Sequence, residues 1–98
     1  MKITGNQIRA ARALAGIEQT FLATSAKLSI NTVRNMEAAG ENVVRVRLDT
    51  LIRVRDALLA KGVIFLDHGD AATGLGVALR SVRQEGTRPE DLTSANDD

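Results

Sequence analysis

The most restrictive pattern in this sequence lies in residues 19–36, which predict two short helices separated by a connection of only three residues. Ser29 is a good N-cap for the second of these helices. Because the connection is so short, the helices cross near a right angle, and only a small side chain such as Ala23 fits at their closest approach. A wedge of apolar side chains then fixes the angle, and its expected members are Leu22, Ala26, Leu28, Val33 and Met36.

Helical patterns also flank this pair. Thr4 and Gln7 form a capping box at the start of a helix that ends at Gly16. The expected apolar stripe of this helix is Ile8, Ala11 and Ala15, with Leu14 beside them. Another helix is expected over residues 48–61, and the preceding residues 41–47 lack helical periodicity and predict a basic loop. The buried face of this last helix is expected to hold Leu48, Leu51, Ile52, Leu58 and Leu59.

Two short apolar runs follow, at residues 63–66 and 76–80, and nine residues rich in turn formers separate them. They predict an antiparallel β-hairpin, which must pack on the helices or on a partner because an isolated hairpin is marginal in water. Residues 81–98 are polar, contain the only proline and predict a flexible acidic tail. The sequence therefore predicts a mainly α fold, with four helices over residues 1–62 and a hairpin over residues 63–80.

The net charge of +1 hides an uneven distribution of charge along the chain. Residues 1–62 contain ten Lys and Arg against five Asp and Glu, whereas residues 63–98 contain three against seven. A basic front region indicates a polyanionic partner such as nucleic acid. The chain has no cysteine, no signal peptide and no run of about 18 apolar residues, so we expect a cytoplasmic protein without a membrane segment.

The stretch from residue 17 to residue 40 resembles the phage-repressor-like helix-turn-helix family, also called the xenobiotic-response-element family. The residues that carry this resemblance are Gln19, Leu22, Ala23, Leu28, Ser29, Val33, Glu37 and Gly40. The resemblance extends over residues 3–62, and the continuation is similar to a bacterial subset in which two strands follow the helices. The sequence departs from the family pattern at Glu18, where Ser or Thr is the usual cap. It departs again at Lys27, which replaces glycine and is expected in the left-handed conformation.

The resemblance implies a repressor-like transcription regulator that binds a palindromic double-stranded DNA site as a homodimer. The second helix of the pair would enter a major groove about 12 Å wide. The residues expected at base edges are Asn31, Arg34 and Asn35, with Ile30 and Thr32 beside them. The residues expected at phosphates are Gln19, Lys27, Ser29, Asn42, Arg45 and Arg47. The dimer surface is expected on the back of the fourth helix and on the two strands.

An alternative function uses the same scaffold: an antitoxin or anti-regulator whose acidic residues 85–98 bind a protein partner. No catalytic constellation is present in the sequence, so we predict no enzyme and no cofactor. The single histidine, His68, has only Asp67 and Asp70 nearby, which is too weak a set to predict a metal site. Two arginines of the first helix, Arg9 and Arg12, are expected to form surface ion pairs.

Overall fold

The computed structural model describes residues 1–67, 69 and 74–80 of the chain. Its elements follow in the order α1 (Gly5–Ala15), α2 (Gln19–Ala26), α3 (Ile30–Ala38), α4 (Leu48–Leu59), β1 (Val63–Leu66) and β2 (Gly76–Leu79). The prediction of a mainly α fold with a C-terminal hairpin is therefore confirmed. The predicted acidic tail lies outside the described residues. None of the described helices has the length and apolar character needed to cross a membrane, the longest being α4 with 12 residues.

The ends of the helices follow their local sequence. The side chain of Thr4 accepts a hydrogen bond from the backbone of Gln7, whose own side chain accepts one from the backbone of Thr4, so the predicted capping box is confirmed. Ser29 caps α3 as expected, by accepting from the backbone N–H three residues later. Lys27 ends α2 with φ of 58°, which confirms the left-handed conformation. Glu18 makes no side-chain cap at the start of α2.

Two predicted element ends differ from the structure. α4 ends at Leu59, two residues before its predicted end, because the following residues form tighter turns in which Lys61 and Gly62 donate to carbonyl groups only three residues back. β2 ends at Leu79 instead of Arg80. The backbone N–H of Arg80 still donates to the carbonyl of Gly62 at 2.6 Å. The hydrogen bonding between the two chain segments therefore continues one residue past the ends of the strands.

The core lies where the four helices and the hairpin meet. Its buried apolar residues are Ile3, Ile8, Ala11, Leu22, Ala23, Ala26, Val33, Met36, Val44, Leu51, Val54, Leu58 and Val63. This confirms the predicted wedge between α2 and α3, although Leu28 is only half-buried.

Three leucines that were predicted on or beside the apolar faces of helices are exposed. Leu14 on α1 and Leu59 on α4 are 44% and 38% exposed. Leu59 directly follows the buried Leu58, about 100° away around the helix, and therefore faces outward. Leu14 lies in the last turn of α1, beyond Ala11, the last buried residue of that helix. Leu48 is 60% exposed because it begins α4, one turn before the stripe of α4 becomes buried at Leu51. Val54, which the prediction omitted, continues that stripe and is fully buried.

The start of α1 touches the end of α3 through the backbone. A Cβ atom on Gly5 would lie 2.6 Å from the carbonyl oxygen of Met36, so only glycine fits at this contact. The backbone of Asn6 donates to the carbonyl of Gly40 at 2.8 Å, which satisfies one of the free N–H groups at the start of α1. Residues 41–47 form a loop, as predicted, and the backbone of Gly5 donates to the carbonyl of Asn42 at 3.3 Å, which attaches this loop to α1.

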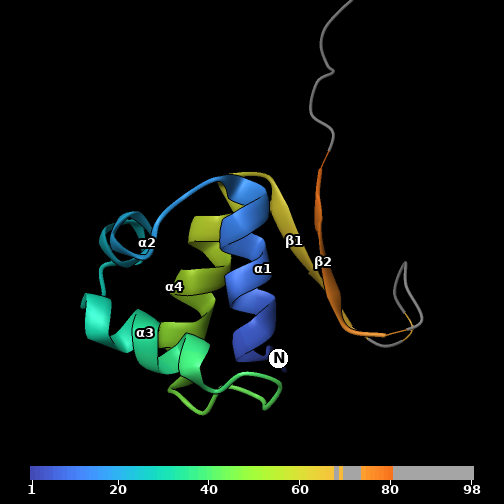
Figure 1. The fold of residues 1–98 in the computed structure, drawn as a ribbon, viewed down its shortest axis with the longest axis horizontal. Coiled ribbons are helices and arrows are strands. Elements are labelled where there is room, and N and C mark those ends of the chain that lie inside the picture. The colour runs from blue at the N-terminus through green and yellow to red at the C-terminus, as the bar shows by residue number, and fades with distance from the viewer. Residues whose placement is uncertain (68, 70–73, 81–98) are drawn as a thin grey trace, which may run out of the picture.

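The hairpin lies beside α1 in Figure 1, and both strands contact that helix. Its strands pair in a register that runs from Val63 opposite Leu79 to Leu66 opposite Gly76. Val63 is buried, and Phe65, two residues further along β1, packs against the core. Because side chains alternate along a strand, Ile64 and Leu66 belong to the opposite face of the hairpin.

Gln7 connects α1 to the hairpin. While its side-chain oxygen accepts from the backbone of Thr4, its Nε2 donates to the carbonyl oxygens of Leu66 and Gly76 at 3.1 and 3.0 Å. These two residues form the last pair of the hairpin, next to its connecting loop. The Gln7 side chain is buried, so its amide is the group that fixes this end of the hairpin on the helix.

Substitution of Gln7 by Glu separates the two roles of this side chain. Glutamate still completes the capping box, but its carboxylate cannot donate to the two strand carbonyls. We expect the free energy of unfolding at neutral pH to fall by about 1–3 kcal/mol, measured by urea denaturation. Lowering the pH protonates the new carboxyl group and restores one donor, so the deficit relative to the original chain shrinks. An equal deficit at every pH would contradict this role of Gln7.

Candidate nucleic-acid interface

The three residues predicted at base edges share one face of α3. Asn31, Arg34 and Asn35 are all exposed. They are three and four residues apart, so they are neighbours on the helix surface. On the opposite side of α3, Val33 and Met36 are buried in the core. The helix therefore presents an amide–guanidinium–amide stripe to the outside while its other face is fixed.

The residues beside this stripe differ in exposure. Ile30 and Thr32 are half-buried, and the Ser29 hydroxyl lies 2.9 Å from the hydroxyl of Thr32. Four further residues predicted at phosphates are exposed, and they flank α3 along the chain: Lys27, Asn42, Arg45 and Arg47. The stripe is thus bounded by Lys27 before α3 and by the basic loop after it.

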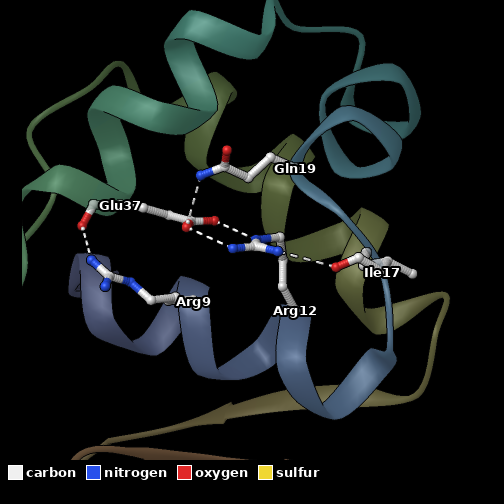
Figure 2. A network of polar contacts seen from close by, with 5 residues as sticks. All are labelled: Arg9, Arg12, Ile17, Gln19 and Glu37. Atoms are coloured by element: carbon white, nitrogen blue, oxygen red, sulfur yellow. Dashed lines mark hydrogen bonds and ion pairs between the residues drawn. The ribbon is translucent and has the colours of Figure 1, made fainter.

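A buried polar network behind the stripe was not predicted from the sequence, and Figure 2 shows its geometry. The Glu37 carboxylate, with its side chain 4% exposed, accepts from Arg12 Nε at 2.6 Å and from Arg12 Nη2 at 3.0 Å. Gln19 Nε2 donates to the same carboxylate at 3.1 Å. The network therefore joins α1, the first residue of α2 and the end of α3 at one buried carboxylate.

The network also holds the connection between α1 and α2. Arg12 Nη1 donates to the carbonyl of Ile17 at 3.1 Å, and Arg9 Nη2 donates to the backbone carbonyl of Glu37 at 3.3 Å. The prediction of a surface ion pair for Arg12 is wrong, because its side chain is only 17% exposed and pairs with a carboxylate inside the fold. The hydrogen bond to Glu37 raises the pKa of the Arg12 guanidinium, which outweighs the lowering caused by burial, so this group stays charged.

Two predicted phosphate contacts have partners within the chain. Gln19, the first residue of α2, is half-buried, and its amide nitrogen donates to the Glu37 carboxylate. It therefore belongs to the buried network. Arg47 pairs with Asp49, its Nε lying 3.1 Å from the Asp49 carboxylate, and both side chains are exposed. Asp49 also lies 4.0 Å from Arg53. No role for Asp49 was predicted from the sequence, although its position two residues after Arg47, in the first turn of α4, was an available signal.

Within residues 1–67, 69 and 74–80, no three His, Cys, Asp or Glu side chains lie close enough together to bind a metal ion. His68 and Asp70 lie outside this range.

No protein-family model matches the sequence, and no curated protein is similar to it. The family resemblance and the roles of the eleven predicted contact residues therefore stay predictions.

Substitution of Glu37 by Gln tests the buried network. The variant leaves the Arg12 guanidinium without its anion in a partly dry environment, so we expect the free energy of unfolding to fall by about 2–4 kcal/mol. The matched control is Asp56→Asn, which removes the anion of an exposed ion pair with Arg55 and should change stability by less than about 1 kcal/mol. Urea denaturation followed by helical circular dichroism measures both variants. Similar small effects would show that the network does not hold the helices.

Proposed function

We propose that this protein is a sequence-specific transcription regulator of the bacterial cytoplasm that binds double-stranded DNA through α3 and is not an enzyme. The observation that carries the proposal is the stripe of Asn31, Arg34 and Asn35, exposed on a helix whose opposite face is fixed. Arginine pairs with guanine O6 and N7 through two hydrogen bonds, and asparagine pairs with adenine N6 and N7 in the same way. This combination of side chains suits base edges in a major groove.

The charges that flank the stripe suit the DNA backbone. Lys27 precedes α3, and Arg45 follows it on a loop that is hydrogen-bonded to the start of α1. A helix inserted in a major groove has phosphates on both sides, and cations there give affinity without sequence preference. We assign Lys27, Ser29, Asn42, Arg45 and Arg47 to these contacts, with Gln19 at the start of α2.

A homodimer on a palindromic site would double the few base contacts that one helix offers. The surface that we assign to the second copy combines the end of α4 with the hairpin. Leu59 is exposed there, and a groove of about 360 Å³ is lined by it and by Ile64 and Leu66. Both faces of the hairpin are apolar, which favours a partner on the face turned away from α1.

The central experiment selects bound duplexes from a random pool and measures their affinities. We expect Arg34→Ala to weaken binding to the selected sequence by about 1–3 kcal/mol and to relax the preference at one base pair. Arg45→Ala should weaken all sequences alike and reduce the slope of log affinity against log salt by about 1. The control is Arg80→Ala, which changes an exposed arginine directly after β2.

The two arginines therefore give distinguishable results. Loss of sequence preference with Arg45→Ala, or unchanged binding with Arg34→Ala, would contradict the proposed orientation of α3. Absence of any salt-dependent binding to duplex DNA would contradict the proposed function itself.

Asp49 should weaken DNA binding in the original chain, because it pairs with Arg47 and places a negative charge near the expected phosphates. We expect Asp49→Asn to raise the affinity for DNA about two- to five-fold, which is the range that an exposed ion pair of up to about 1 kcal/mol can supply. The control is again Asp56→Asn, because its carboxylate pairs with Arg55 and belongs to no predicted contact. Equal effects of both variants in a binding titration would show only a change of net charge.

The oligomeric state tests the dimer surface. We expect the protein to elute at twice the 10.5 kDa mass of one chain. Leu59→Arg should shift it to the mass of one chain, because the new charge would enter the apolar contact. Leu14→Arg is the matched control, since Leu14 is similarly exposed in the last turn of α1. If the original protein elutes at the mass of one chain, the dimer proposal is wrong. The description of the fold of one chain does not depend on this result.

A further inference from the structure

A groove between α2 and α4 lies outside the α3 stripe and the proposed dimer surface. Its volume is about 480 Å³, and it is lined by small residues that include Ala26 of α2, Ala57 of α4 and Ala60, which directly follows α4. Phe21 stands at its edge, half exposed, with Lys61 Nζ 4.7 Å from the centre of its ring. The cation–π contact holds the Lys61 charge over the aromatic face. The groove thus combines an apolar floor with an ordered cation.

The rim of this groove is positively charged. Lys27, Arg53 and Lys61 line it, and all three are exposed. The one carboxylate on the rim, Asp56, is already paired with Arg55 at 3.1 Å. The groove therefore suits an acidic segment that also carries an aliphatic side chain.

The chain itself supplies such a segment. Residues 85–98 contain five acidic residues, one arginine and a single large aliphatic residue, Leu92, which directly follows Glu90 and Asp91. The last described residue is Arg80, whose backbone is hydrogen-bonded to Gly62, the neighbour of Lys61 on the groove rim. The last described residue before this segment therefore lies near the Lys61 end of the groove.

We propose that residues 85–98 bind in the groove between α2 and α4 of the same chain. The nine residues that separate Arg80 from Glu90 reach up to about 30 Å when extended, which is enough to cover the groove from its Lys61 end. A tether of this length gives an effective concentration on the order of millimolar, so a weak contact suffices for occupancy. In the bound state the carboxylates of residues 90–91 face the rim cations, and Leu92 covers the alanines.

Occupancy of the groove has a consequence for DNA binding, and this step rests on the proposed function. Lys27 borders the groove and is also one of the predicted phosphate contacts. An acidic segment beside Lys27 would repel phosphates, so binding of the segment and binding of DNA should oppose each other. Removal of the five negative charges should then raise the affinity for DNA, whereas the docking itself is measured without DNA.

The test uses the full chain, which contains no cysteine, so Ala95→Cys gives one attachment point for a nitroxide label. In ¹⁵N-labelled protein, the nitroxide weakens the amide signals of residues close to it. We expect the signals of Phe21, Ser25 and Lys61 to be much weaker with the nitroxide than after the nitroxide has been reduced. The amide signals of Arg34 and Val43 should keep their intensity. Raising the salt to about 1 M, where the Debye length is about 3 Å, should restore the lost intensity.

Charge reversal provides the matched comparison. Lys61→Glu should restore the groove signals, whereas Lys2→Glu changes the net charge equally, lies outside the groove and should leave them weak. Unaffected groove signals in the labelled original chain would overturn the proposal. Signal loss centred on Asn31 to Asn35 would overturn it in favour of a segment that covers the α3 stripe. Signal loss that also occurs when label and ¹⁵N are on different copies would overturn it in favour of docking on a second molecule.

Discussion

The arrangement of the helices depends on one buried ion pair. Arg12 and Glu37 meet through two hydrogen bonds of 2.6 and 3.0 Å, and Gln19 adds a third to the same carboxylate. A buried charge is tolerated only when it is paired and its remaining bonding capacity is used, so the partners must be correctly placed at the same time. This requirement fixes α1, α2 and α3 relative to each other more specifically than apolar contacts alone. The exposed face of α3 owes its orientation to this constraint.

The contact between α1 and α3 works together with that pair. Gly5 lets the backbone of α1 approach the carbonyl groups at the end of α3, and Asn6 then bonds to the carbonyl of Gly40. The loop that follows α3 is therefore attached to α1 instead of extending freely. At the other side of α1, Gln7 binds both strands of the hairpin. α1 is thus the element to which the α3 region and the hairpin are both attached.

Residues 1–62 have a basic composition, but their positive charges are not spread evenly over the surface. Arg12 and Glu37 neutralise each other inside the fold. Arg47 has a neighbouring carboxylate in Asp49, whereas Arg34 and Arg45 form none of the ion pairs among the described residues. Arg47 directly precedes α4, whereas Lys61 follows the other end of this helix and contacts Phe21 at the α2–α4 groove. The positive charge is therefore divided between the α3 side and the α2–α4 groove, and Lys27 lies at the border of both.

Local sequence was enough to determine the elements of this protein. Thr4, Ser29 and Gly16 mark helix ends because capping depends on residues within one turn. Apolar periodicity located the helices, and two short apolar runs located the strands. Periodicity failed for Leu14, Leu48 and Leu59, because it gives the direction of a side chain and not whether another element covers it. The Arg12–Glu37 pair, the Gln7 bonds to the hairpin and the groove beside Lys61 join residues that are far apart in the chain. Only the tertiary structure decided them, because the strength of each contact depends on a distance and a degree of burial that arise after the helices have packed.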